Sequence, residues 1–87
     1  MKILNIGFEN IVSLDRVISI LNPEAAPVKR IIKNNKNSGN LLDASCGRKT
    51  QSVIIMDSGH VILSALKPET LENRVAKEDN SVGEENF

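Results

Sequence analysis

The chain has 87 residues and carries eleven basic and eleven acidic side chains, so its formal net charge is zero. The absence of Trp and Tyr, with only two Phe, predicts an aliphatic core, and a single cysteine excludes an internal disulfide and a cysteine-based zinc cluster. No apolar run approaches the roughly 18 residues of a membrane span, and no secretory signal pattern opens the chain, so we expect a cytoplasmic protein built as one small domain.

The fold class follows from the order of the predicted elements. Strands are predicted where apolar residues alternate or cluster, and helices where proline or acidic residues open an apolar periodic run. In chain order the pattern predicts strand, strand, helix, three strands and a last helix, over residues 2–8, 10–21, 25–37, 41–44, 51–56, 60–66 and 68–76. The second strand is expected to bend near residues 14–15. The result is a small α+β domain with about five strands, mainly antiparallel.

The helix over 25–37 has the best-defined limits. Pro27 fits a first helical turn, where its missing N–H matters least, and Gly39 provides a stop signal just beyond the end. Val28, Ile31, Ile32 and Asn35 fall on one side of this helix. The opposite side is basic and carries Lys29, Lys33 and Lys36.

The charge is divided unevenly along the chain. Residues 1–49 carry eight basic and four acidic side chains, a balance of +4, and residues 50–87 carry three and seven, a balance of −4. The last residues, KEDNSVGEENF, are acidic and poor in apolar side chains, which is typical of a disordered tail. We therefore expect one domain over 1–76 and an acidic, disordered tail over 77–87. A basic domain body makes a polyanionic partner possible.

Catalysis has little support in the sequence. His60 is the only histidine, and its neighbours Asp57 and Ser58 lie on one tight turn, whereas catalytic triads gather residues from separate elements. Cys46 has no second histidine to activate it, although Arg48 nearby would favour a thiolate. The stretch GRKT lacks the first glycine of a phosphate-binding P-loop and is followed by a strand. Asp57 and His60 alone do not make a metal site, so we expect no enzyme activity, no metal and no cofactor.

Nucleic-acid binding fits the basic residues better. Arg48 and Lys49 follow Gly47 on a predicted turn, from which their side chains can reach a phosphate or a base edge. Arg16 stands among apolar residues and is expected either to pair with Asp15 or to point at a partner. The helix lysines could add phosphate contacts, although a basic helix side is commonly only solvated. Too few aromatic residues are present for a single-strand stacking platform, which leaves duplex DNA open.

Several longer stretches resemble one known family. LNIGFENIVSLDRVISILNPEAAPVKRII and LLDASCGRKTQSVIIMDSGHVILSALKPET, with the spacing between them, are similar to the RemA family of small bacterial regulators of biofilm extracellular-matrix genes. The resemblance covers about residues 3–75. It implies a fold similar to LytTR-type DNA-binding domains. It also implies a transcriptional regulator that binds double-stranded DNA as a ring-shaped homo-oligomer, and the expected ring is an octamer. No membrane association and no small-molecule substrate are implied.

The resemblance also implies roles for individual residues. The family's DNA-contacting arginine matches Arg16, its adjacent basic pair matches Arg48 and Lys49, and its functionally sensitive proline matches Pro27, for which a structural or assembly role is expected. At the second position of the basic pair this chain has lysine where arginine is common, which keeps the charge but loses the bidentate geometry. Cys46 stands where the family often has tyrosine. The alternative function is an oligomeric scaffold that binds RNA or protein.

Overall fold

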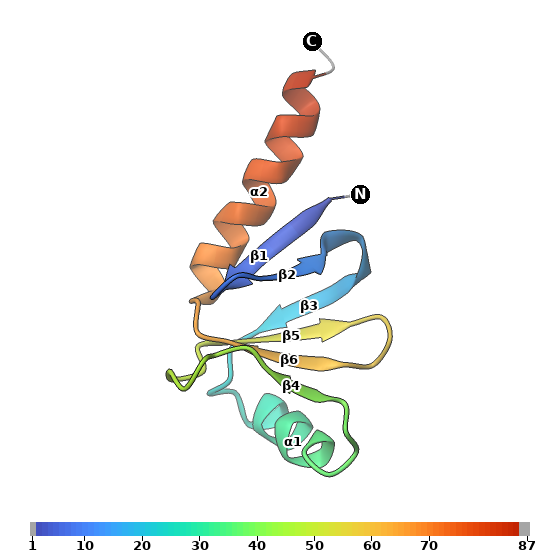
Figure 1. The fold of residues 1–87 in the computed structure, drawn as a ribbon, viewed down its shortest axis with the longest axis vertical. Helices are drawn as coiled ribbons and strands as arrows, with labels where there is room; N and C mark the ends of the chain where they lie inside the picture. Colours follow the sequence, from blue (N-terminus) through green and yellow to red (C-terminus); the bar gives the residue numbers. More distant parts are fainter. Residues whose placement is uncertain (1, 86–87) are drawn as a thin grey trace.

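The computed structural model describes residues 2–85, with side-chain surroundings for residues 2–77. Within residues 2–85, six strands form two sheets, accompanied by two α-helices and one short 3₁₀ helix (Figure 1). The elements are β1 (Ile3–Gly7), β2 (Asn10–Ser13), the 3₁₀ helix (Leu14–Arg16), β3 (Val17–Leu21), α1 (Ala26–Asn35), β4 (Leu41–Asp43), β5 (Ser52–Met56), β6 (Val61–Ser64) and α2 (Pro68–Glu85). The predicted small α+β fold is confirmed.

The two sheets have different sizes and orders. β1 and β2 form an antiparallel pair, and the larger sheet has the order β3-β5-β6-β4. In that sheet β3 pairs antiparallel with β5, and β5 pairs antiparallel with β6. β4 runs parallel to β6, because helix α1 and its connections carry the chain from one edge of the sheet, β3, to the other edge, β4. β3 and β4 are therefore the open edges of the larger sheet.

The single bent strand expected over residues 10–21 is wrong in one respect. The segment forms two strands in two different sheets, separated by the 3₁₀ helix Leu14–Arg16. Ser13 and Val17 on either side keep an extended backbone, and the N–H of Leu14 donates to the carbonyl of Lys2 at 3.0 Å. The run of Ile and Val correctly predicted an extended chain. Such a pattern carries no signal that the chain leaves one sheet and enters another.

The core lies on both faces of the two central strands. On one face Ile54 and Ile62 pack with Leu71 of α2 and with residues of β1. On the other face Val53 and Val61 pack with Val28 of α1. Because neighbouring residues of a strand point to opposite faces, a strand covered on both sides needs an unbroken apolar run, as in VIIM and VIL. The two helices accordingly lie at opposite ends of the molecule (Figure 1).

The last helix is longer than the sequence suggested. We expected it to end near residue 76, but α2 extends to Glu85. No proline stands between Lys77 and Glu85, so nothing in this stretch sterically stops a helix that Pro68 and Glu69 have opened. We also expected the domain to end at residue 76 and a disordered tail over 77–87. The side chains of this segment lie mainly outside the described ones, so both expectations stay predictions.

Candidate nucleic-acid interface

The predicted basic turn is a tight, anchored turn between β4 and β5. The N–H of Arg48 donates to the carbonyl of Ser45 at 3.0 Å, and the two central residues, Cys46 and Gly47, have φ of 55° and 79°. Positive φ at both central positions is the geometry of a type I′ turn, in which glycine is unstrained and cysteine is not. Gly47 therefore permits the chain reversal that delivers Arg48 to the surface.

Asp43 fixes the start of this turn. Its Oδ1 accepts hydrogen bonds from both the backbone N–H of Ser45, at 2.9 Å, and the Ser45 hydroxyl. These bonds, led by that from the hydroxyl, favour the ionised carboxylate and hold the pKa of Asp43 below its ordinary value of 3.8. Ser45 itself is buried. Sequence reasoning missed this anchor, although an aspartate two residues before a serine is a recognisable turn signal.

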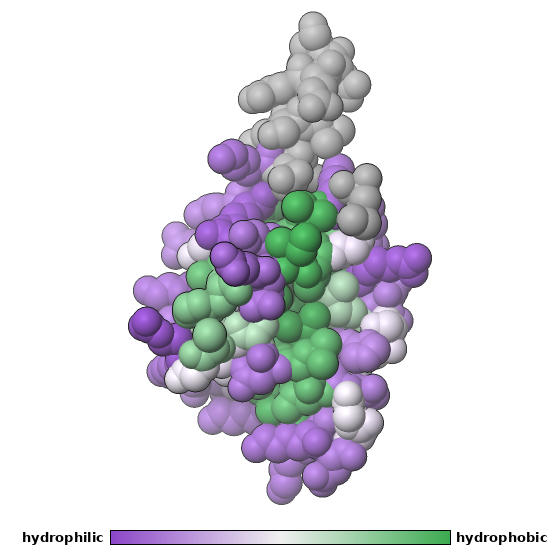
Figure 2. Space-filling model, viewed as in Figure 1, coloured by the Kyte–Doolittle hydropathy of each residue, from purple (hydrophilic) through white to green (hydrophobic). Residues whose placement is uncertain are grey.

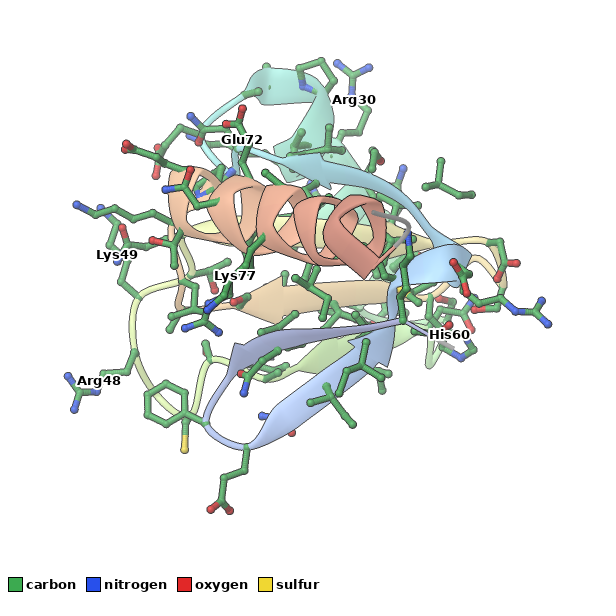
Figure 3. The ribbon with its side chains drawn as sticks, turned by 90° about the horizontal axis from the view of Figure 1, so that it is seen from above. Arg30, Arg48, Lys49, His60, Glu72 and Lys77 are labelled. Carbon is green, nitrogen blue, oxygen red and sulfur yellow. The ribbon has the colours of Figure 1, made fainter. Side chains whose placement is uncertain are left out.

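Arg48 and Lys49 are accessible cations at the end of this turn. Both are exposed, and neither forms a hydrogen bond through its side chain or an ion pair with another residue in the part of the chain with described side chains. Figure 3 shows both side chains directed away from the ribbon at the same side of the molecule. A cation without an internal partner keeps its full charge available for an external anion. Of the predicted binding residues, this pair has the geometry that phosphate binding needs.

Two shallow hollows flank Lys49. One, of about 370 Å³, is lined by Phe8, Arg48, Lys49, Gln51, Ala65 and Leu66. The other, of about 310 Å³, lies beside the start of α2 and includes Lys49 and Lys67. Neither Phe8 nor Lys67 was singled out from the sequence, because β1, β5 and α2 converge here from distant parts of the chain. The basic turn thus has an aromatic side chain on one side and a third cation on the other.

Arg16 lies at the other end of the sheet. Its Nη1 donates to Oδ2 of Asp57 at 3.1 Å, and the N–H of Asp57 donates to the Arg16 carbonyl at 2.8 Å. Of the two alternatives expected for Arg16, an ion pair with Asp15 is wrong, because the carboxylate that it contacts belongs to Asp57. β5 lies between Lys49 and Asp57, and five residues at about 3.4 Å each place its ends roughly 17 Å apart. Within one chain, Arg16 and the Arg48–Lys49 pair do not form a single patch.

The helix lysines face solvent on α1. Val28, Ile31 and Ile32 pack toward the sheet, so Lys29, Lys33 and Lys36 are left exposed. Lys29 lies 3.8 Å from Glu24, an exposed ion pair. Arg30 of the same helix lies well apart from Arg48 (Figure 3). Pro27 is exposed in the first turn of α1, as expected for its fixed φ.

The residues considered for catalysis are also separated. Nδ1 of His60 shares a hydrogen bond of 2.7 Å with Oγ of Ser58, while the Asp57 carboxylate accepts from Arg16. His60 lies on the side of the molecule opposite Arg48 and Lys49 (Figure 3). Among residues with described side chains, no cluster of three or more metal-ligating groups occurs. Over the same described residues, no helix combines the length and apolarity that crossing a membrane requires.

Comparison with known proteins identifies one family over most of the chain. The family model described as extracellular matrix regulatory protein A-like matches residues 3–75. A protein of Carboxydothermus hydrogenoformans is 56% identical over 87 residues, covering 100% of this chain and 98% of its own. One from Desulfitobacterium hafniense is 55% identical over 86 residues, covering 98% and 94%. One from a Cyanothece species is 60% identical over 74 residues, covering 85% and 81%.

All three relatives carry the name "Putative regulatory protein", and none is named as an enzyme. The matched stretch runs from β1 into α2, so it includes both sheets, the basic turn and Arg16. These matches support a regulatory role. The chain belongs to the RemA-like family, the family of extracellular matrix regulatory protein A.

Proposed function

We propose that this protein is a transcriptional regulator that binds duplex DNA as a ring-shaped homo-oligomer. The observation that carries the proposal is the anchored turn that presents Arg48 and Lys49 to solvent without internal partners. Two adjacent cations on a rigid turn suit a DNA backbone, whose phosphates recur at close spacing. The family description favours genes of the extracellular matrix as targets, and a chromosomal target agrees with a cytoplasmic location.

One chain offers few cations for this task. Because Arg16 lies at the far end of β5 from Arg48 and Lys49, a single copy presents two small, separate contact points. Repeating them around an oligomer turns the second and later contacts into intramolecular events with a high effective concentration. Weak individual contacts can then sum to tight binding of a long duplex.

The surface supports association between copies. The aliphatic side chains of Ile3, Ile11, Ile18 and Leu42 are 42%, 56%, 65% and 48% exposed. Figure 2 shows hydrophobic side chains gathered in a band on one face. Ile18 lies on the open edge strand β3 and Leu42 on the other edge strand, β4. A contact between two different surfaces of neighbouring copies generates a ring when the rotation closes.

The proposal is tested by fluorescence anisotropy with a labelled duplex, together with the mass in solution from light scattering. Replacing both Arg48 and Lys49 by alanine is expected to abolish binding at moderate salt and leave the mass unchanged. Arg30→Ala, which removes one arginine from the exposed side of α1, is the control and is expected to bind nearly as wild type. Equal affinity of the double variant would refute the site. A monomer at micromolar concentration would refute the ring, and preferential competition by RNA would refute duplex DNA as the partner.

A further inference from the structure

Phe8 occupies an unusual position for an aromatic residue. It is the first of two residues at the tip of the β1–β2 hairpin, between the paired residues Gly7 and Asn10. Phe8 and Glu9 have φ of 53° and 66°, the left-handed conformation that a two-residue turn requires and that Asn or Gly adopts most easily. A bulky side chain at positive φ is strained, so this turn would be more stable with asparagine at position 8.

Burial of the phenyl ring does not compensate for that backbone strain. Phe8 is 47% exposed and belongs to neither of the two core clusters. An exposed, strained aromatic residue contributes little to folding. Its presence at this turn therefore points to a contact outside the chain.

The hairpin tip is held firmly in place. The side-chain amide of Asn10 donates to the carbonyls of Gly7, at 3.1 Å, and Phe8, at 3.3 Å, and Asn5 Oδ1 accepts from the N–H of Gly7 at 2.8 Å. A Cβ on Gly7 would approach Leu66 Cγ to 3.3 Å, so the backbone here lies close to the Leu66 side chain, in the connection from β6 to α2. Phe8 is thus presented on a rigid support.

The surroundings of Phe8 indicate the chemistry of the partner. The ring lines the same hollow as Arg48 and Lys49, while Glu9, the acidic residue beside it, does not line that hollow. An apolar ring next to two partner-free cations matches a surface in which anionic groups border flat apolar groups. Duplex DNA has this arrangement, with phosphates along the groove and stacked bases within it.

We propose that Phe8 is a DNA-contacting wedge that enters the minor groove beside the phosphates bound by Arg48 and Lys49 and partly unstacks one base step. The inference rests on the proposed function and adds a second kind of contact to it. Apolar wedges of this kind bend the duplex, and pyrimidine–purine steps yield most easily to them. Phe8 therefore favours flexible steps and directs the bend of the bound DNA, whereas the phosphate contacts of Arg48 and Lys49 carry no sequence preference.

The test compares Phe8→Asn with the adjacent control Glu9→Asn, using a duplex with TA steps in which 2-aminopurine reports unstacking. Asparagine suits the turn at both positions, so both variants are expected to fold and assemble as wild type. Phe8→Asn is expected to weaken binding at least about tenfold, the scale for loss of one base–aromatic contact, because every bound subunit loses its contact. It should also abolish the rise in 2-aminopurine fluorescence. The slope of affinity against salt should not change, because Phe8 neutralises no phosphate. Glu9→Asn should retain affinity and the fluorescence rise.

The outcomes separate this inference from the proposed function. A wild-type protein that binds no duplex would overturn both. Wild-type binding that Phe8→Asn matches in affinity and fluorescence would overturn the wedge alone. A changed mass of the Phe8→Asn assembly would show that the phenyl ring of Phe8 lies between subunits, and it would also overturn the wedge. Phe8→Leu, which retains an apolar wedge, is expected to keep part of the fluorescence rise, and its behaving like Phe8→Asn would count against insertion.

Discussion

Arg16 and Asp57 are joined twice, by a side-chain ion pair of 3.1 Å and by a backbone hydrogen bond of 2.8 Å from the Asp57 N–H to the Arg16 carbonyl. The two side chains are 69% and 44% exposed. The backbone bond fixes where Arg16 emerges from the 3₁₀ helix. Because the ion pair is exposed, it holds the Arg16 guanidinium only weakly, and an external phosphate can compete with the Asp57 carboxylate for it.

The first prediction concerns this competition. Asp57→Asn removes the carboxylate but keeps the backbone bond, and it is expected to tighten duplex binding by up to about fivefold, the equivalent of an exposed ion pair of about 1 kcal/mol. Arg16→Ala is expected to weaken binding. Anisotropy titrations measure both. Glu24→Gln, which removes a similarly exposed carboxylate beside Lys29, is the control. Weaker binding by Asp57→Asn would show instead that the ion pair orients Arg16 for DNA.

The second prediction separates the roles of Arg48 and Lys49. Each alanine substitution should lower the slope of log affinity against log salt by about 0.9 for every subunit in contact with the duplex, because it removes one phosphate contact per subunit. Lys49→Arg should strengthen binding, since a guanidinium adds a second parallel hydrogen bond. Arg48→Ala alone should also reduce discrimination between sequences, which a selection from a random duplex pool measures. Equal loss of discrimination in Lys49→Ala would contradict this division.

A third prediction follows from the lowered pKa of Asp43. A carboxyl group whose pKa is lower in the folded protein than in the unfolded one adds stability at pH values above its unfolded pKa, near 3.8. That stability is lost as the pH falls through the lower, folded value. Asp43→Ala should therefore reduce the free energy of unfolding by about 1 kcal/mol at neutral pH, since it removes hydrogen bonds to a charged group at a partly solvated site.

Chemical denaturation at neutral pH and below pH 3 checks this expectation, and the difference between wild type and Asp43→Ala should shrink in acid. Asp43→Asn, whose side-chain oxygen can still accept from Ser45, is the control and should retain most of the stability at neutral pH. A difference that stays constant with pH would show that the carboxylate charge is not the cause.

The fourth prediction concerns backbone strain in the basic turn. Cys46→Asn should stabilise the protein by about 1 kcal/mol, because asparagine tolerates positive φ better than cysteine. Gly47→Ala should destabilise it by about 1 kcal/mol. A Cβ at Gly47 would meet no atom within 4 Å, so that cost comes from backbone conformation alone. Thermal unfolding measures both variants, and no change in either would mean that the turn relaxes at little cost.

The fifth prediction tests the surface of β3. Ile18 is 65% exposed and lines a groove of about 540 Å³ that also includes Leu14, Val17, Ile20 and Val75. Ile18→Lys should dissociate the proposed oligomer, because it would place a charge in an apolar contact, and leave the circular dichroism of the fold unchanged. Asn34→Lys, which adds the same charge to an exposed position of α1, is the control. An unchanged mass for Ile18→Lys would exclude this face from the subunit contact.

Local patterns were sufficient for most of the elements and for the basic turn. The apolar runs over β5 and β6, the proline at the start of α1 and the Gly47 turn each depend on residues close together in sequence. They therefore predicted the α+β class, the order of helices and strands apart from the division of residues 10–21, and the exposure of Arg48 and Lys49. The turn residues Gly39 and Gly47 both adopt positive φ, as their positions indicated.

Only the tertiary structure decided which distant residues meet. Four features depend on segments far apart in the chain. They are the division of residues 10–21 between two sheets, the parallel pairing of β4 with β6, the ion pair of Arg16 with Asp57 rather than Asp15, and the position of Phe8 beside Arg48. A strand's own residues specify its extended form and its buried face, but its neighbours are chosen by the summed packing of the whole core. For that reason the sequence by itself determined the elements and the charged turn, and the fold determined that Arg16 and this turn lie at opposite ends of β5.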